Sequence, residues 1–185
     1  MTRKDKLKIM QWNIRSIKAN RDNLINLISE RDPDLIFLNE TWLKPTQTFN
    51  LKAYKTLKQD RDDGYGGVAT CIKTNIKFDK IREINSDSTQ CIIIKISDYH
   101  LINVYTNSNN NINEEWLQEL MRNIHTDKII IMGDLNSHHP LWDNSPINKG
   151  GKILSDFIMD RDLVVMNDGS PTLFKNTNYK LVHSI

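Results

Sequence analysis

Gly133-Asp134-Leu135-Asn136 is the segment of this sequence best suited to chemistry. Three consecutive isoleucines lie just before it, which predicts a buried strand that ends at these residues. Side chains alternate along a strand, so Asp134 and Asn136 are expected to point to the same side. A carboxylate beside an amide suits metal-assisted phosphoryl chemistry, because one group binds an ion or orients water and the other holds a phosphate oxygen. Taken alone, the tetrapeptide is more typical of an Asx turn.

Three further polar residues stand at the ends of predicted strands. Glu40 follows the apolar run from Leu35 to Leu38, and a carboxylate at the mouth of a sheet commonly meets a divalent ion. Asn13 closes the first strand-like run, and Tyr105 ends another, where its hydroxyl could bond a phosphate. Each residue by itself is more typical of a solvated strand end or, for the tyrosine, of half-buried packing. Together they favour a shared site more than any one of them does.

A loop with two histidines and a tryptophan follows the Asp-Leu-Asn segment. His138 and Trp142 could therefore contact a nucleotide by hydrogen bonding or stacking. A pair of loop histidines is more often surface decoration than a zinc site, and no third ligand at useful spacing supports zinc. The sequence has no Gly-rich phosphate loop, HExxH or GxSxG, which excludes P-loop, zincin and hydrolase-elbow mechanisms.

The elements that would position these residues begin with strand, helix, strand. Leu7 to Trp12 is β-prone, Asn20 to Arg31 has apolar residues at helical spacing, and Asp34 to Glu40 contains a buried-strand pattern. A hairpin-rich middle follows, with β-prone runs at Gly66 to Lys73, Ile76 to Ile84, Gln90 to Ile96 and His100 to Tyr105.

The second half returns to helices. Asn113 is a candidate cap for a helix through Ile124, Lys128 to Asp134 is again a strand, and Gly150 to Asp162 is a third helix. Short strands are predicted at Leu163 to Met166, Thr172 to Phe174 and Tyr179 to Ile185. This order predicts an α/β fold in which two sheets pack face to face with helices outside.

Composition indicates one soluble globular domain over residues 1–185, with 38% hydrophobic and 26% charged residues. The net charge of +2 provides no strong basic field that would indicate nucleic acid. No apolar signal core or membrane-length run occurs, so the nucleus or cytoplasm is expected. Cys71 and Cys91 lie in apolar segments, which favours two buried thiols over a disulfide.

Five short motifs, in this order, resemble those of the endonuclease/exonuclease/phosphatase superfamily: Gln11-Trp12-Asn13, Glu40-Thr41-Trp42, Gly66-Gly67-Val68-Ala69, Asn103-Val104-Tyr105 and Gly133-Asp134-Leu135-Asn136. Their order, spacing and position at strand ends argue against chance. Within the superfamily, Glu40 to Leu43 and Asn136 to Trp142 look most like the apurinic-type endonucleases of non-LTR (LINE-like) retrotransposons. Those enzymes nick target DNA to prime reverse transcription.

The resemblance implies a DNA substrate and a Mg²⁺ cofactor, with Mn²⁺ as an alternative. By the resemblance, Asn13 and Glu40 help to hold the metal, Tyr105 contacts the scissile phosphate, and Asp134 with Asn136 orients the attacking water and the phosphate.

Two other functions stay open. One is a phosphatase or lipid phosphodiesterase of the same superfamily, and the other is a catalytically dead remnant that only binds nucleic acid. Arg15 stands where repair-type relatives tend to carry an acidic residue, which counts against a repair enzyme.

The resemblance also predicts motifs that these residues do not contain. Superfamily members continue with a Ser-Ile-Asp-Leu-like strand and a Ser-Asp-His motif, whose Asp-His pair is central to catalysis. Ser184-Ile185 resembles the start of the first motif, and none of the 5 histidines has a Ser-Asp-His context. We therefore expect a domain that is truncated at its C-terminus and inactive or weakly active by itself.

Overall fold

The computed structural model describes residues 6–108, 112–143 and 145–167. Their elements follow the order β1 (Ile9–Asn13), α1 (Ile17–Arg31), β2 (Leu35–Asn39), β3 (Tyr54–Gln59), β4 (Val68–Lys73), β5 (Asp79–Asn85), β6 (Thr89–Ile96), β7 (Tyr99–Thr106), α2 (Glu114–Met121), β8 (Ile129–Asp134) and α3 (Lys149–Asp160). The chain divides into two compact units. The first contains the described part of residues 1–105 and Asp127–Asp134, and the second contains Thr106–Thr126 and the described chain from Leu135 onward. The expectation of a single domain stays a prediction.

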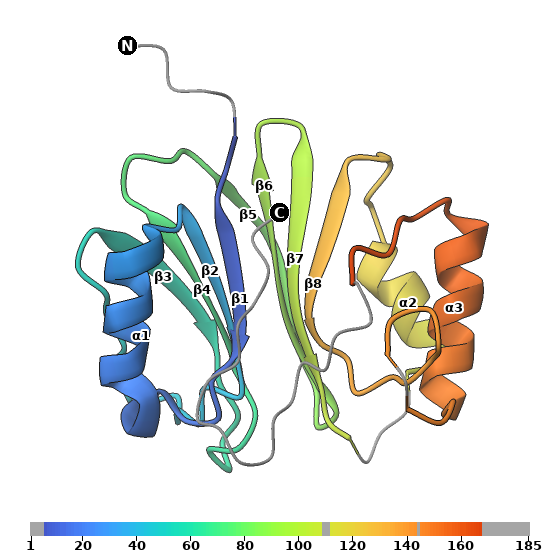
Figure 1. Cartoon of the computed structure of the whole chain (residues 1–185), viewed down its shortest axis with the longest axis horizontal. Coiled ribbons are helices and arrows are strands. Elements are labelled where there is room, and N and C mark those ends of the chain that lie inside the picture. Colours follow the sequence, from blue (N-terminus) through green and yellow to red (C-terminus); the bar gives the residue numbers. More distant parts are fainter. Residues whose placement is uncertain (1–5, 109–111, 144, 168–185) are drawn as a thin grey trace. The chain divides into compact units, whose positions relative to one another are not determined.

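The first unit is a sandwich of two four-stranded sheets, ordered β1-β2-β4-β3 and β5-β6-β7-β8 (Figure 1). Each sheet is mixed: β1 pairs with β2 in parallel and β7 with β8 in parallel, whereas β2–β4, β3–β4 and β5–β6 are antiparallel. The predicted α/β two-sheet fold with helices is therefore confirmed. Because the carboxyl ends of two parallel strands meet at one edge, each sheet brings two strand ends together.

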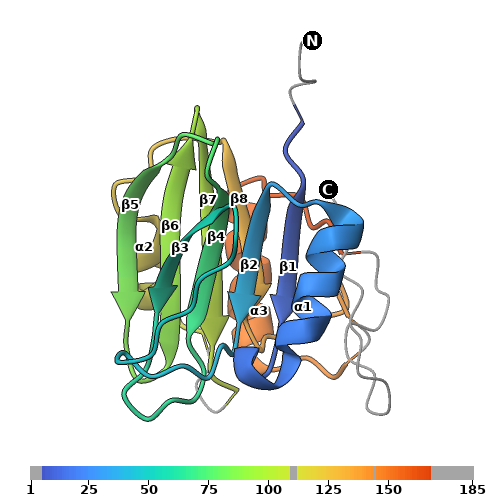
Figure 2. The same ribbon diagram turned by 90° about the vertical axis from the view of Figure 1, so that its left-hand side faces the viewer.

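Strand β2 is buried along its whole length, which explains its continuous apolar run. Its side chains alternate between two cores. Leu35 and Phe37 pack between the sheets, in a cluster that includes Ile92, Ile94 and Leu101. Ile36 and Leu38 pack on the other face beneath α1, whose Leu24 is fully buried, and Figure 2 shows α1 lying over β1 and β2.

Helix α1 begins three residues earlier than predicted. Ser16 is its N-cap, and the Ser16 side chain accepts a hydrogen bond from the Ala19 N–H at 3.3 Å. Asn20, the predicted start, instead donates from its side chain to the Ile14 carbonyl at 2.8 Å. The predicted end is confirmed, because Asp32 adopts a left-handed φ of 46° just before Pro33.

Three strand predictions differ from the structure. Strand β3 was not predicted, because it is an edge strand of mixed Lys, Thr and Gln residues without an apolar run. Ile76 lies in a turn before β5. The strand predicted at Leu163 to Met166 is wrong, since these residues form none and Val164 is 79% exposed. The strands predicted at 172–174 and 179–185 lie outside the described residues.

Within the second unit, both helices are capped by asparagine. Asn113 accepts a bond from the Trp116 N–H at 2.8 Å, which confirms the predicted cap of α2. Asn148 accepts from the Gly151 N–H at 2.7 Å and caps α3. Gly151 allows α3 to approach the chain closely, because a Cβ there would overlap the His138 carbonyl.

Across the part of the chain that the structure describes, no helix combines the length and apolar character needed to span a bilayer. Cys71 and Cys91 are both buried and free, as predicted. Burial raises the pKa of each thiol to about 12, so neither is a reactive thiolate at neutral pH.

Candidate active site

The two parallel strand pairs place four polar residues at or next to the carboxyl ends of their strands. In the first sheet, Asn13 ends β1 opposite Asn39, and Glu40 follows directly after β2. In the second sheet, Tyr105 of β7 lies in register with Asp134 at the end of β8. All of these residues belong to the first unit. The carboxyl ends of parallel strands are common sites for ligands in open α/β sheets.

Asn13 connects the two sheets at this edge. Its Nδ2 donates to Glu40 Oε1 at 2.7 Å and to Asp134 Oδ2 at 2.5 Å. One amide thus lies between two carboxylates that come from different sheets. The structure brings together three of the residues that the sequence singled out, and Asn13 and Asp134 are 121 positions apart in the chain.

The oxygen of the same amide is a candidate cation ligand. Asn13 is only 7% exposed, and its Oδ1 is buried without a hydrogen-bond partner among the described residues. The orientation of this amide follows from its neighbours, because an oxygen placed between two carboxylates would be repelled. A buried acceptor without a partner is costly, and a cation bound to Oδ1 would remove that cost.

The donor set suits a hard cation. Within the described ranges, no three or more His, Cys, Asp and Glu side chains gather in a group that could hold a metal. The site therefore has two carboxylates, Glu40 and Asp134, and the Asn13 amide oxygen. Mg²⁺ is usually bound through one or two carboxylates and keeps several waters, whereas structural zinc takes four Cys or His ligands. These residues fit Mg²⁺.

The backbone after β2 is strained and directs Glu40. Glu40 has a φ of 51° and Trp42 a φ of 53°, both in the left-handed region that non-glycine residues rarely adopt. The Glu40 carbonyl accepts from the Ser16 N–H at 2.8 Å, and the Trp42 N–H donates to the Gly66 carbonyl at 3.0 Å. Such conformations cost about 1–3 kcal/mol each and tend to cluster at functional sites.

Tyr105 is half-buried within electrostatic reach of both carboxylates. Burial, followed by the charges of Glu40 and Asp134, raises its pKa to about 12, while Arg61 and Arg15 act in the opposite direction. The phenol therefore stays protonated at neutral pH and can donate a hydrogen bond to an anionic oxygen.

Tyr105→Phe is expected to reduce the loss of stability at high pH. The folded pKa of about 12 lies above the ordinary value of 10.0, so the neutral phenol stabilises the fold fully below pH 10.0. That stabilisation is lost as the pH rises towards 12. We expect the loss to be about 1 kcal/mol of the free energy of unfolding, after allowance for the partial exposure of the side chain. Urea unfolding at about pH 9.5 and about pH 11 measures the difference.

Tyr54→Phe is the control for this measurement. The pKa of Tyr54 is also raised to about 12, by burial and then by Asp32 and Asp34. Tyr54→Phe should therefore remove a similar share of the loss in unfolding free energy between the two pH values. If the parent and Tyr105→Phe lose stability in parallel between the two pH values, the charged surroundings assigned to Tyr105 are wrong.

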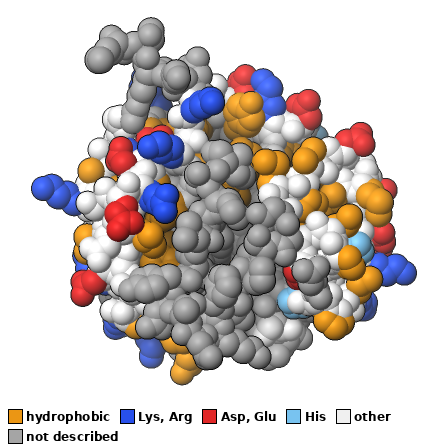
Figure 3. Space-filling model, in the orientation of Figure 1, with side chains coloured by type: hydrophobic (Ala, Val, Ile, Leu, Met, Phe, Trp, Pro, Cys, Tyr) orange, Lys and Arg blue, Asp and Glu red, His pale blue; other side chains and the backbone are white. Residues whose placement is uncertain are grey.

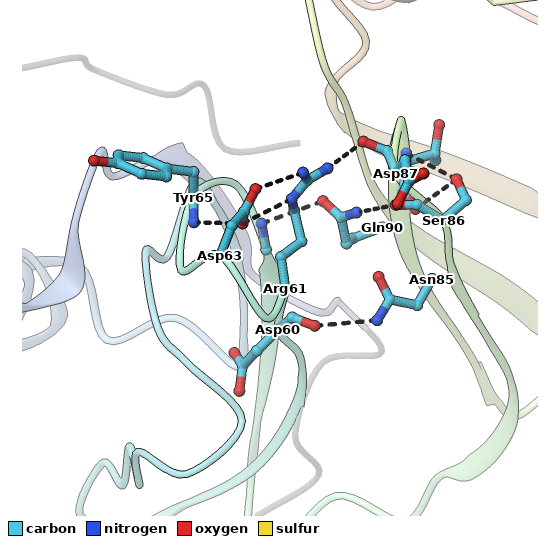
Figure 4. A network of polar contacts seen from close by, with 10 residues as sticks. Asp60, Arg61, Asp63, Tyr65, Asn85, Ser86, Asp87 and Gln90 are labelled. Atoms are coloured by element: carbon cyan, nitrogen blue, oxygen red, sulfur yellow. Dashed lines mark hydrogen bonds and ion pairs between the residues drawn. The ribbon is translucent and has the colours of Figure 1, made fainter.

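The loop between β3 and β4 is held to the turn between β5 and β6 by several side chains (Figure 4). Arg61 pairs with Asp63 through two bonds of 3.1 and 2.6 Å and also donates to the Asp87 carbonyl. Those bonds and the Tyr65 N–H lower the pKa of Asp63 to about 2. Gln90 accepts from the Gly67 N–H at 3.3 Å and donates to the Ser86 carbonyl at 2.7 Å.

This loop also borders Tyr105. A Cβ at Gly66 would lie 2.8 Å from the Tyr105 ring and 3.1 Å from both Arg61 Cδ and Gln90 Oε1, so only glycine fits there. The glycines of this turn were recognised from the sequence, whereas Arg61 and Gln90 were missed. The roles of these two residues depend on contacts across 26 and 23 positions, which no local pattern reveals.

The other predicted site residues belong to the second unit. Strand β8 ends at Asp134 and Asn136 has a left-handed φ of 47°, so strand alternation does not determine where Asn136 points. The Asn136 Nδ2 donates to the Thr106 carbonyl at 2.7 Å. His138 Nδ1 lies 2.8 Å from Asp143 Oδ2, and Trp142 Nε1 donates to the Ser137 carbonyl at 2.7 Å. One polar group of each side chain thus stabilises the loop. The contacts of these residues with substrate stay predictions.

Charged side chains are mixed on the face shown in Figure 3, where Lys and Arg alternate with Asp and Glu among the described residues. This distribution agrees with the net charge of +2. Attraction of a polyanion would therefore depend on local groups such as Arg15 and Arg61 rather than on a broad field.

Comparisons with known proteins show the family of the chain and its fold. The model of the "Endonuclease/Exonuclease/phosphatase family" matches residues 10–180. The RNA-directed DNA polymerase from mobile element jockey of Drosophila melanogaster is 24% identical over 177 residues, covering 91% of this chain and 19% of that protein. The probable RNA-directed DNA polymerase from transposon BS of the same organism is 22% identical over 176 residues, with the same coverage. The chain thus spans about a fifth of the length of these relatives.

Solved structures show the same fold. The endonuclease domain of TRAS1, a telomere-specific non-LTR retrotransposon, is similar with a TM-score of 0.74 and 17% identity, covering 94% of this chain and 80% of that domain. An AP endonuclease from Archaeoglobus fulgidus has a TM-score of 0.61 and 22% identity, covering 76% of this chain and 62% of that protein.

Proposed function

Because the chain belongs to the endonuclease/exonuclease/phosphatase family, we propose that it is a Mg²⁺-dependent DNA endonuclease of the retrotransposon type. The observation that carries the proposal is the contact of Asn13 with both Glu40 and Asp134, beside Tyr105. This contact joins the ends of strands from two sheets beside an amide oxygen that has no partner in the described part of the chain.

The side chains have separate roles in hydrolysis of the phosphodiester. Glu40 and the Asn13 oxygen hold Mg²⁺ or, alternatively, Mn²⁺. The bound ion supplies Lewis-acid polarisation of the phosphate. Asp134 orients the attacking water and accepts its proton, while the protonated Tyr105 donates to a phosphate oxygen. Asn13 holds the two carboxylates in place, so that water and phosphate are aligned for in-line attack.

The second unit contains the other residues for which the resemblance implies a role. By that resemblance, Asn136 holds a phosphate oxygen, and His138 with Trp142 contacts a nucleotide. The rings of Trp142 and His139 lie with their centroids 5.1 Å apart and their planes tilted by 34°, and this aromatic surface suits a nucleobase. A DNA substrate places the protein in the nucleus, where target DNA is found.

Relaxation of supercoiled plasmid in the presence of Mg²⁺ tests the proposal. Glu40→Gln is expected to raise the Mg²⁺ concentration for half-maximal nicking about 10- to 100-fold, because loss of a direct ligand costs at least as much as loss of an outer partner. The rate of the parent should be low, since the sequence contains no Ser-Asp-His motif. Glu30→Gln is a matched control, because Glu30 is an exposed carboxylate of α1.

Two other outcomes identify the alternatives. Release of phosphate from inositol phosphates without plasmid nicking would indicate a phosphatase or phosphodiesterase. Plasmid binding without nicking, with equal affinity for the parent and Asp134→Ala, would indicate a catalytically dead binding domain. The same Mg²⁺ requirement in the parent and Glu40→Gln would remove Glu40 from the metal site.

A further inference from the structure

Three amide side chains from strands β1, β2 and β7 lie beside the proposed site. Gln11 of β1 donates to Asn39 Oδ1 at 2.6 Å, and Asn39 of β2 donates to Asn103 Oδ1 of β7 at 2.9 Å. We call Gln11, Asn39 and Asn103 the amide relay. None of them contacts the metal ligands through its own hydrogen bonds in the structure.

Every polar atom of the two central amides has a partner. Asn39 Nδ2 also donates to the Val104 carbonyl at 3.1 Å. Asn103 Nδ2 donates to the Ala69 carbonyl at 2.9 Å and to Thr70 Oγ1 at 3.1 Å. Asn39 and Asn103 are each 0% exposed. Burial of an amide without partners is costly, so this full pairing is what allows polar side chains in the interior.

The relay crosses from one sheet to the other. Gln11 and Asn39 belong to the sheet of β1 and β2, and Asn103 belongs to the sheet of β7 and β8. Apolar side chains would fill this space without any preferred separation, because hydrophobic contact is not directional. The bonds that cross between the sheets join Asn39 to Asn103 at 2.9 Å and Asn39 to the Val104 carbonyl at 3.1 Å, and they specify both the distance between the sheets and their register.

Each relay residue is one or two positions from a site residue. Gln11 precedes Asn13 by two residues on the same face of β1, Asn39 directly precedes Glu40, and Asn103 precedes Tyr105 by two residues on β7. A shift of one sheet relative to the other at the relay would therefore move Asn13 and Glu40 away from Asp134 and Tyr105. The Asn13–Asp134 contact of 2.5 Å leaves little room for such a shift.

We propose that Asn39 is a positioning residue for the active site and that the amide relay sets the distance between the two sheets at which Asn13 contacts both Glu40 and Asp134. This inference rests on the proposed metal-dependent function. The amide side chains stabilise the interior less than apolar side chains would, but their hydrogen bonds define the geometry at the strand ends.

The test replaces the whole relay with apolar side chains of similar size, in the variant Gln11→Leu/Asn39→Leu/Asn103→Leu. No relay amide is left behind without its partner, although the Val104 and Ala69 carbonyls and Thr70 Oγ1 each lose one donor, so we expect a folded protein of lower stability. The Mg²⁺ dissociation constant, measured by calorimetry, should rise about 10-fold, and plasmid nicking should lose kcat about 10-fold with KM unchanged. Exchange of the Asn13 side-chain amide hydrogens, followed by NMR, should accelerate as the bond to Asp134 loosens.

Tyr54→Phe is the matched control. It removes a bond of 2.5 Å to the Pro33 carbonyl at the opposite end of the same sheet, so it should keep the parental Mg²⁺ affinity and Asn13 exchange. If the triple variant does not fold, Asn103→Leu alone removes the Asn39–Asn103 bond between the sheets, while Asn39 keeps its bonds with Gln11 and the Val104 carbonyl, and it should still weaken Mg²⁺ binding and speed the exchange.

The outcomes separate this inference from the proposed function. If the parent binds Mg²⁺ but does not nick plasmid, the proposed nuclease activity is contradicted. The Mg²⁺ affinity of the relay variant, compared with that of the parent, then still tests the relay. A parent that binds no Mg²⁺ contradicts the metal site, and Asn13 exchange then judges the relay. A folded relay variant with parental affinity and parental Asn13 exchange overturns the positioning role.

Discussion

Replacement of Asp134 by asparagine is expected to lower the rate of plasmid nicking by about 10²- to 10⁴-fold. Asparagine keeps an oxygen that can accept the Asn13 Nδ2 bond of 2.5 Å, so the contact between the sheets survives. The variant loses the negative charge and the basicity that would orient water and take up its proton. Single-turnover nicking at saturating Mg²⁺ measures the loss in the chemical step and separates it from any loss of metal affinity.

Asp127→Asn is the matched control for that experiment. Asp127 is an exposed carboxylate just before β8, at the end of the strand opposite to Asp134. The same change of charge should leave nicking within about twofold of the parent, as is usual for surface substitutions away from a site. Equal cutting by Asp134→Asn and the parent would remove Asp134 from the mechanism.

Gly133→Ala is expected to lower the free energy of unfolding by about 3–5 kcal/mol. Gly133 has a φ of 153°, and a Cβ at this position would overlap the backbone carbonyl of Val104 on the paired strand β7. The neighbour is backbone and cannot rotate away, so the strand must move. Urea denaturation gives the loss, and near-ultraviolet circular dichroism shows whether the variant keeps its tertiary packing.

Gly64→Ala shows how much of that loss comes from the collision. Gly64 also has a positive φ, of 77°, but a Cβ there would meet only the flexible Lys44 side chain, at 3.1 Å. We expect a loss of about 1 kcal/mol from the backbone conformation alone. A similar loss for both variants would show that β7 and β8 are farther apart than the structure has them.

Polar residues at strand ends were the part of the site that the sequence could reveal. Along each inner face, alternate residues change from apolar to polar towards the carboxyl end: Ile9, Gln11 and Asn13 on β1; Leu35, Phe37 and Asn39 on β2; Leu101, Asn103 and Tyr105 on β7; Ile130, Met132 and Asp134 on β8. This pattern is local, because it depends only on the two-residue repeat of a strand. Asn13, Tyr105 and Asp134 were singled out as polar residues at the ends of these strands.

Elements without a strong periodic signal were predicted less well. The edge strand β3 carries lysines on a half-exposed surface, so it lacks the apolar repeat that marks the buried strands. Leu163 to Met166 has the composition of a strand, yet it forms none and exposes Val164 and Met166. Propensity is a weak guide where pairing with a neighbouring strand decides the outcome.

Patterns along the chain were enough to predict the two-sheet fold, the strand ends and the kind of chemistry that their side chains allow, because strand periodicity is local and the order of the motifs can be read directly from the sequence. The packing of the two sheets was needed to see that Asn13 donates to both Glu40 and Asp134, that its oxygen has no partner among the described residues, and that Gln11, Asn39 and Asn103 link the sheets beside them. These contacts join residues up to 121 positions apart, and their existence depends on how the sheets pack. No pattern within one strand encodes the distance to the other sheet.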